Sequence, residues 1–405
     1  MLSLRIAVVL GIATIANLAV AADWFVAPDG DDAQSGKIDA PLATVTKGQE
    51  LASPGDTVYI RGGLYNDFAE LPRVGWYNVA IHLKKSDVSY VAYPGETPVF
   101  DFSKAPTNRR VTGFLISGTN VTMRGIHVTG TPVGEQKQSE CFRIAGSRAV
   151  GHFYDCVARG NAAIGFYWTS GSRGSATRCD AYDNISRNPK SIGNIDGFGA
   201  HAEGVEFRYC RAWNNSDDGF DAISSPGANL FDHCWAFNHR AGGDSNGFKI
   251  GGFGADPKTK LPVPLPVHEV RFCIAAFNGA KGFYANHHPG QAAVWTRNSA
   301  YGNGGGNFNM LERRPDMSED IPGDKEVLHG NLAFRGPSTK ADATPAENAT
   351  DNSWTRPGVT VDAKDFVSVD WKELMRPRTP EGDLPHIDFL RLKADSDLQG
   401  LGAVE

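Results

Sequence analysis

The chain has 405 residues, a net charge of −6 and 46 glycines, and no leucine occurs between Leu115 and Leu230. A stretch of that length without the leading apolar helix former excludes a helical bundle or an ordinary layered α/β core. With 41% hydrophobic residues the chain is not disordered, and its mildly acidic charge gives no general reason to bind nucleic acid or anionic lipid.

The first 21 residues have the pattern of a secretory signal peptide. Arg5 gives a positive start, residues 6–20 are largely apolar, and residues 19–21 form a small-residue cleavage site. A membrane anchor is the alternative, but the apolar run is short and Asn17 interrupts it. We therefore expect a secreted protein, extracellular or periplasmic, with no membrane association after cleavage.

One sequence frame recurs seven times along the chain. Each copy begins with Cys or Asn and has Ala two residues later. The lead residues are Cys156, Cys179, Cys210, Cys234, Cys273, Asn298 and Asn331. Their spacing varies from 23 to 39 residues, and a near-constant minimum with variable insertions is typical of stacked coils with loops.

A second marker, Gly-Phe or Asn-Phe, follows the lead residue in six copies. The phenylalanines are Phe166, Phe198, Phe220, Phe248, Phe283 and Phe308. Gly and Asn tolerate positive φ and suit tight turns, while small and aromatic residues fill a narrow interior as stacked columns. The pattern predicts an all-β protein, a parallel β-helix with two short strands per coil, and it explains the missing leucine.

The regions outside the repeat predict how the β-helix is closed. Residues 88–93 and 121–128 alternate like strands, and residues 42–51 predict a helix that caps the first coil. Residues 337–405 lose the repeat, and we expect this irregular segment to pack on the outside and close the far end, with a late strand at 389–392. The expected organisation is a signal peptide (1–21), a β-helix domain (22–336) and a C-terminal segment (337–405), with an independent C-terminal module as the alternative.

The six cysteines predict a buried column rather than a disulfide framework. Five of them share the lead position of the repeat, so neighbours would lie about 4.8 Å apart, which a disulfide accepts. Stacked side chains point in parallel, however, so we expect free buried thiols that act as small hydrophobes.

Polar residues beside the Gly-Phe markers mark the candidate site. Asp196, Asp218 and Asn246 each precede the Gly, and Asp221 and Lys249 each follow the Phe. If the Phe points inward, strand alternation sends the residue after it outward. Gly199, Asp221, Lys249 and Tyr284 then form one outward column, in which Asp221 and Lys249 are direct neighbours.

Four carboxylates, those of Asp196, Asp217, Asp218 and Asp221, therefore gather within two or three coils. Such a cluster would be partly protonated unless a cation joined it. Carboxylate oxygens without His or Cys favour Ca²⁺, whose flexible coordination suits an irregular turn better than that of Mg²⁺. Solvated turns rich in Asn and Asp are the alternative, but residues 216–221 are denser in acid than any other turn of the chain.

These motifs resemble a known family. The segments 215–221 (Asn-Ser-Asp-Asp-Gly-Phe-Asp), 246–252 (Asn-Gly-Phe-Lys-Ile-Gly-Gly) and 196–198 (Asp-Gly-Phe) are similar to the pattern of polysaccharide lyase family 9, in the pectate-lyase-like right-handed β-helix superfamily. Residues 24–65 resemble the N-terminal cap of that group, although many β-helix proteins of other function share such a cap. The resemblance covers nearly the whole mature chain.

The resemblance implies a calcium ion held by four Asp and a Lys that acts as base. The matching positions are Asp196, Asp217, Asp218 and Asp221 for the ion and Lys249 for the base. An insertion between residues 161 and 196 makes Asp196 the least secure of the five.

The residues and the implied chemistry agree. A uronate has an acidified C5–H beside its carboxylate, and a bound cation stabilises the charge that develops when the proton leaves. Lys249 must be neutral to accept that proton, and a nearby cation lowers the pKa of the lysine. We expect β-elimination from an acidic polysaccharide, most readily pectate, with a 4,5-unsaturated product.

Four further residues are weaker candidates for substrate contacts. His287, His288 and Tyr284 lie one coil beyond Lys249, and Arg240 is available for a substrate carboxylate. The long insertion at 252–268 predicts a wall of the cleft. We expect the protein to act as a monomer.

Two other functions remain open from the sequence. A polygalacturonase-like hydrolase would use Asp217 and Asp218 as acid and base, but Lys249 and Asp221 would then lack a role. A β-helix adhesin or carbohydrate-binding protein with a structural Ca²⁺ would need no base at all.

Overall fold

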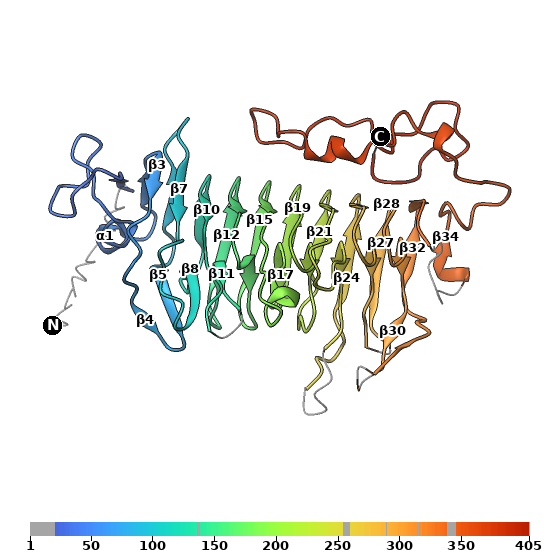
Figure 1. Cartoon of the computed structure of the whole chain (residues 1–405), viewed down its shortest axis with the longest axis horizontal. Helices are drawn as coiled ribbons and strands as arrows, with labels where there is room; N and C mark the ends of the chain where they lie inside the picture. Colours follow the sequence, from blue (N-terminus) through green and yellow to red (C-terminus); the bar gives the residue numbers. More distant parts are fainter. Residues whose placement is uncertain are drawn as a thin grey trace, which may run out of the picture.

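The computed structural model describes residues 21–135, 138–253, 260–288, 290–314, 316, 318–337 and 346–404. The signal peptide assigned to residues 1–21 lies almost wholly outside this part of the chain. The described residues form one long stack of coils, with the C-terminal segment lying alongside it (Figure 1).

Three parallel sheets run along the stack, and all neighbouring strands within the first two pair in parallel. The first sheet consists of β1 (Asp23–Val26), β2 (Thr57–Ile60), β6 (Ser89–Ala92), β9 (Val121–Arg124), β12 (Val150–Tyr154), β15 (Arg173–Thr177), β18 (Val205–Arg208), β21 (Leu230–Asp232), β24 (Val267–Arg271), β27 (Ala292–Thr296), β32 (Val327–His329) and β34 (Ala349–Thr350). The second sheet consists of β3 (Gly63–Tyr65), β7 (Pro98–Asp101), β10 (His127–Thr129), β13 (Val157–Arg159), β16 (Asp180–Tyr182), β19 (Arg211–Trp213), β22 (Trp235–Phe237), β25 (Ile274–Ala276), β28 (Ser299–Tyr301) and β33 (Leu332–Phe334).

The third sheet carries the Gly-Phe markers. It consists of β4 (Arg73–Val74), β5 (Tyr77–Leu83), β8 (Arg110–Ile116), β11 (Glu140–Ile144), β14 (Ile164–Trp168), β17 (Phe198–Ala200), β20 (Phe220–Asp221), β23 (Phe248–Lys249), β26 (Phe283–Tyr284) and β29 (Phe308–Asn309). Only β4 pairs antiparallel in it, and a separate hairpin joins β30 (Glu312–Arg313) and β31 (Asp320–Ile321).

The parallel β-helix is confirmed, but the number of strands per coil was wrong. Each full coil has three strands, and in most coils a turn of two residues, the first of them left-handed, separates the strand of the first sheet from that of the second. Tyr209 (φ 55°) and His233 (φ 54°) are examples. Similarly, residues 121–128 are not one strand, because the chain turns at Gly125 (φ 71°) between β9 and β10. A turn of only two residues leaves no visible break in the sequence pattern, so the sequence alone predicts one strand where the structure has two.

The interior consists of columns of identical side chains. The repeat alanines from Ala158 to Ala333 pair in register along the second sheet. The phenylalanines from Phe142 to Phe308 stack along the third sheet with ring centroids 4.7 to 5.1 Å apart. All six cysteines are buried free thiols, as expected. A branched Leu would fit neither the Ala column nor the flat Phe stack.

A ladder of buried amides fixes the turns that lead into the third sheet. Asn161 donates from Nδ2 to Oδ1 of Asn184 at 2.8 Å, and Asn184 donates in the same way to Asn215 at 3.0 Å. Each of these side chains also reaches a backbone carbonyl of the preceding coil. The ladder satisfies buried polar groups that the turns would otherwise leave unpaired.

The predicted N-terminal helix is present as α1 (Val45–Leu51), capped by the hydroxyl of Thr44, which accepts from the backbone N–H of Lys47 at 3.0 Å. Val45 and Gly48 are buried against the first coil, so the helix covers the start of the core. At the other end Trp354 packs on Phe308, with ring centroids 5.0 Å apart.

The C-terminal segment packs on the outside of the second sheet (Figure 1). Its described residues contain three short 3₁₀ helices, Ala346–Asn348, Ala363–Asp365 and Trp371–Met375. Another 3₁₀ helix, Ile192–Asn194, lies outside this segment, before β17. The ring of Trp371 stacks on Phe277 at 5.1 Å, and buried Asp180 pairs with both Arg211 and Arg378. The expected strand at 389–392 is not a regular strand, since Phe389 and Leu392 form only isolated bridges.

Replacing Asn184 tests the amide ladder. We expect Asn184→Ala to lower the free energy of unfolding by about 1–3 kcal/mol, because it leaves buried partners on two neighbouring coils unsatisfied. Urea unfolding followed by circular dichroism measures the change. Asn194 is exposed and, like Asn184, precedes β17, so Asn194→Ala is the matched control. Equal effects of the two variants would contradict a role of the ladder.

Candidate functional site

The third sheet brings the predicted outward column together. Gly199 pairs with Asp221, Asp221 with Lys249, and Lys249 with Tyr284. The Nζ atom of Lys249 lies 4.0 Å from Oδ2 of Asp221. The adjacency of Asp221 and Lys249 that the sequence predicts is therefore what the register produces.

The residues that precede each Gly form a second polar column beside the first. The backbone N–H of Asp218 donates to Oδ1 of Asp196 at 3.2 Å. Asn246 donates to Oδ1 of Asp218 from its backbone at 2.8 Å and from its side chain at 2.9 Å. Asp196, despite the insertion before it, lies in the cluster.

Asp217 belongs to the same turn but faces a different neighbour. Its Oδ1 accepts a hydrogen bond of 2.6 Å from the backbone N–H of Asp244. The carboxylate of Asp244, in turn, lies 2.7 Å from Nζ of Lys249. Sequence reasoning missed Asp244. The available signal was its position: Asp244 lies four residues before Phe248, which aligns it with Ser216, the residue before the acidic pair of the preceding coil.

The carboxylates are close enough to share a cation. Oxygens of Asp196, Asp218 and Asp221 lie within 4.8 Å of one another, as do those of Asp217, Asp218 and Asp244. Oδ2 of Asp218 is buried and has no hydrogen-bond partner among the described residues. This oxygen faces Nζ of Lys249, at 3.4 Å, and an all-carboxylate donor set of this kind fits a hard cation such as Ca²⁺, not a site for zinc or copper.

Burial and mutual repulsion disfavour the charged form of these acids. Burial raises the pKa of Asp217 to about 8, and the neighbouring charge of Asp218 adds to this. Burial likewise raises the pKa of Asp218 to about 6, although Lys249 opposes the shift. Burial and the charge of Asp217 raise the pKa of Asp196 well above its ordinary value. Protons or a cation must therefore compensate the cluster.

Lys249 is in direct contact with these acids, and its Nζ lies 3.4 Å from Oδ2 of Asp218. Burial alone would lower the pKa of Lys249, but Asp218, Asp221 and Asp244 together raise it above its ordinary value. The lysine is thus held protonated for as long as these carboxylates carry charge and face it.

His201 is a second residue that sequence reasoning missed. Its Nε2 lies 3.9 Å from Oδ1 of Asp221, and its Nδ1 lies 3.3 Å from the hydroxyl of Tyr167. Burial lowers the pKa of His201. It follows β17 without any repeat marker, so no pattern distinguished it.

The four weaker candidates have different surroundings. Tyr284 is beside Lys249, and its hydroxyl donates to Asp320 at 3.2 Å and accepts from Arg313 at 3.1 Å. Arg240 instead donates to the carbonyl of Phe277 and lies over that ring, on the side where Trp371 of the C-terminal segment packs. Arg240 is exposed, and neither of these contacts joins it to the acid cluster, so its contact with substrate stays a prediction.

The two histidines do not line an open cleft. His287 is wholly buried, and its Nε2 lies 3.0 Å from Oε1 of the equally buried Glu326. His288 is buried too and accepts from the backbone N–H of Phe253 at 2.9 Å. His287 lies beyond the end of β26 and forms only an isolated bridge with Glu312, and the contact with substrate proposed for it stays a prediction. The wall expected at 252–268 falls partly on residues 254–259, outside the described residues.

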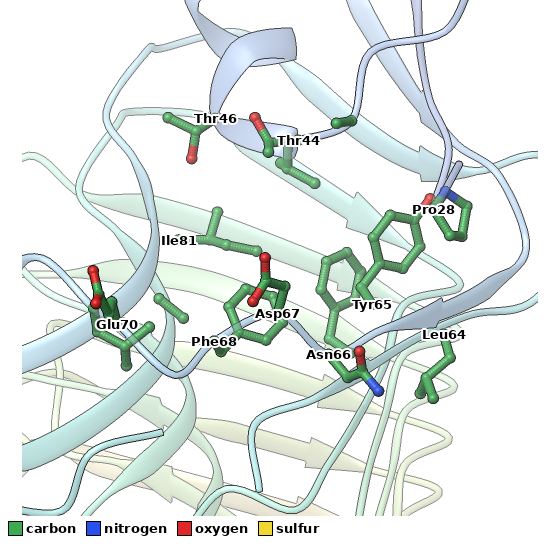
Figure 2. A pocket seen from close by; sticks show the side chains of 15 residues that line it. Pro28, Thr44, Thr46, Leu64, Tyr65, Asn66, Asp67, Phe68, Glu70 and Ile81 are labelled. Atoms are coloured by element: carbon green, nitrogen blue, oxygen red, sulfur yellow. The ribbon is translucent and has the colours of Figure 1, made fainter. Parts of the chain in front are cut away.

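A cavity of about 360 Å³ lies far from these residues, between α1 and the segment 64–71 (Figure 2). Tyr65, Phe68 and Phe100 are among its apolar walls, and Asp67 and Glu70 are the only charged residues among those that line it. It has no lysine, arginine or histidine beside these two acids, so it does not offer the combination of cation site and basic side chain found at Lys249.

Comparison with known proteins agrees with this geometry. The model of the Pel9A-like right-handed β-helix region matches residues 24–331. This chain belongs to polysaccharide lyase family 9. It is 30% identical to pectate lyase L of Dickeya chrysanthemi over 94% of this chain and 86% of that protein. Among solved structures it is similar to a rhamnogalacturonan lyase (TM-score 0.85, 34% identity, 94% and 99% of the two chains) and to pectate lyase Pel9A (TM-score 0.72, 25% identity, 93% and 90%).

Membership of family 9 makes the protein a polysaccharide lyase and the acid cluster with Lys249 its candidate active site. Within the part of the chain that the structure describes, no helix has the length and apolar character needed to cross a bilayer.

The raised carboxyl pKa values predict a pH dependence of stability. In the presence of a chelator, the folded protein keeps a proton on Asp217 up to about pH 8, whereas the unfolded chain loses it near the ordinary value of 3.8. Folding thus binds a proton between these values, and the free energy of unfolding should fall as the pH rises from about 4 to about 8. Thermal melting in chelator across this range measures the trend. Asp217→Asn should make the slope shallower, with the remainder due to Asp218 and Asp196, and equal slopes for the variant and the parent would refute the assignment.

Proposed function

We propose that this family 9 enzyme is a calcium-dependent lyase that cleaves a uronate polymer, most readily pectate, by β-elimination with Lys249 as the base. The observation that carries the proposal is the juxtaposition of Lys249 with Asp218 and Asp221, one coil away, on the outward face of the third sheet. A hydrolase would need two carboxylates and would leave this lysine without a task.

Asp196, Asp217, Asp218 and Asp221 would hold the ion. When bound, Ca²⁺ would neutralise the carboxylate of a uronate and so favour loss of the proton on C5. The missing hydrogen-bond partner of Asp218 Oδ2 supports its role as a ligand.

Lys249 would take the C5 proton on Nζ. The C–H electron pair forms the C4=C5 double bond, the bond from C4 to the glycosidic oxygen breaks, and the departing oxygen takes a proton from water. For this the lysine must be neutral. Asp218 and Asp221, which raise the pKa of Lys249 in the structure, would do so less once a cation engaged their charge, while Asp244 would remain beside Nζ. Proton removal and occupation of the acid cluster are therefore coupled through Asp218 and Asp221.

The substrate is proposed from chemistry and from similarity. A cation site beside a base suits a sugar that carries a carboxylate on C5, and both galacturonate and glucuronate polymers have one. The names of the relatives, pectate lyase and rhamnogalacturonan lyase, support a pectic polymer. The apolar start of the chain supports export, and we propose action as a monomer.

Replacing the base tests the mechanism. We expect Lys249→Ala to lower the rate of unsaturated product formation from polygalacturonate by at least about 100-fold, because general base catalysis contributes 10²–10⁴. The ultraviolet absorbance of the unsaturated product is the measurement, and Lys190→Ala, at an exposed lysine, is the control. Full turnover by Lys249→Ala in the presence of Ca²⁺ would refute the proposal, whereas reducing sugar without the absorbance would indicate a hydrolase.

Replacing Asp196 tests the ion. Because the Asp196 carboxyl is already disfavoured as an anion, we expect Asp196→Asn to leave the melting temperature in chelator unchanged or higher. The rise in melting temperature that Ca²⁺ causes in the parent protein should be reduced or lost. Calorimetry with and without Ca²⁺ measures both, with the exposed Glu203→Gln as control. A full Ca²⁺-induced rise in the variant would remove Asp196 from the site.

A further inference from the structure

Upstream of the acid cluster, the same outward column carries a second group of polar and aromatic side chains. Arg143 pairs in register with Tyr167, and Tyr167 pairs with Gly199. Gly199 is the neighbour of Asp221, so Arg143 lies four strands from Lys249 on one face of one sheet. At about 4.8 Å per strand this is about 19 Å, a distance that several consecutive sugars of a bound polymer span.

Arg143 is held in a fixed orientation. Its guanidinium lies 4.7 Å from the ring centre of Tyr77 and 5.4 Å from that of Tyr167. Its NH1 nitrogen also lies 2.8 Å from Oε1 of the wholly buried Glu140. Ion pairing and two flanking rings together fix the planar guanidinium before any ligand arrives, which lowers the entropic cost of binding.

The local charge is positive. Glu140 also forms an ion pair with Arg110, so one carboxylate serves two guanidinium groups. Nε of Arg110 is buried and has no hydrogen-bond partner among the described residues. About 13% of the Arg143 side chain and 14% of the Arg110 side chain are exposed. Part of each positively charged side chain is therefore accessible to a ligand, while the rest is held in place by burial.

A continuous row of side chains links this group to the acid cluster. The hydroxyl of Tyr167 meets His201, and His201 meets Asp221. The ring of Tyr167 lies over Gly199, where an added Cβ would come within 2.6 Å of it. The glycine thus leaves room for an aromatic surface on the path between the two charged groups.

We propose that Arg143, supported by Arg110 and with Tyr167 as an apolar platform, is a distal subsite that binds the carboxylate of a second uronate on the same polymer chain. This inference rests on the proposed function and adds where the substrate lies and what it must carry. A guanidinium binds a carboxylate through two parallel hydrogen bonds, and the face of an aromatic ring accommodates the apolar face of a sugar. The subsite therefore selects long, unesterified acidic chains.

Binding of galacturonate oligomers tests the subsite without turnover. Calorimetric titration of Lys249→Ala with hexagalacturonate in Ca²⁺ gives the reference affinity. We expect Arg143→Ala in this background to weaken binding by about 10- to 100-fold, and Arg143→Lys, which keeps the charge but loses the fork, to weaken it by several-fold. Arg124→Ala, a half-exposed arginine on β9 of the first sheet, should have no effect. A methyl-esterified hexamer should bind the parent and Arg143→Ala alike.

Turnover gives a second measurement with Lys249 intact. Arg143→Ala should raise KM for the hexamer and leave kcat, and the KM for the trimer, unchanged, since a trimer at Lys249 does not reach the subsite. If the parent binds the hexamer and Arg143→Ala and Arg143→Lys bind it equally well, the subsite is refuted while the proposed function stands. If the hexamer binds but no unsaturated product forms, only the proposed chemistry fails. Absence of binding to the parent overturns both.

Discussion

In-register stacking of parallel strands is the interaction on which the rest of this protein depends. Each backbone position repeats about 4.8 Å away in the next coil, so a side chain meets its counterpart rather than a random neighbour. Inside, this repetition is favourable for flat rings, small aliphatic groups and amides that bond head to tail, as in the column from Phe142 to Phe308 and the ladder of Asn161, Asn184 and Asn215.

Outside, the same repetition brings like charges together. Asp196 and Asp218 lie one coil apart because the frame that stacks their neighbouring phenylalanines leaves them no other place. The repulsion is not relieved by solvent, since these acids are buried. Binding of a cation or of protons relieves this repulsion in the folded state. The folding stability of the protein is therefore linked to cation concentration and pH.

The scaffold fixes this unfavourable arrangement through interactions on either side of it. Asn215 immediately precedes the acidic turn: its side-chain amide bonds to Asn184 on the preceding coil, and its backbone N–H donates to Nδ1 of His239 on the next. On the far side of the stack, the C-terminal segment covers the second sheet, and Arg378 joins Arg211 around buried Asp180. The rigid core holds Asp218, Asp221 and Lys249 on short strands and tight turns, where small displacements would separate the groups.

The sequence by itself determined the β-helix, the buried thiols and the adjacency of Asp221 and Lys249, because these follow from a repeat that is visible in the spacing of the residues. It did not give the number of strands in a coil, since a turn of two residues, such as those that begin at Tyr209 or Gly125, does not interrupt the pattern. It also missed Asp244 and His201, and it did not show that His287 is buried, because these side-chain directions depend on insertions without a period. Only the tertiary structure decided which of these groups face the acid cluster, because turns of unequal length set orientation through packing against neighbouring coils.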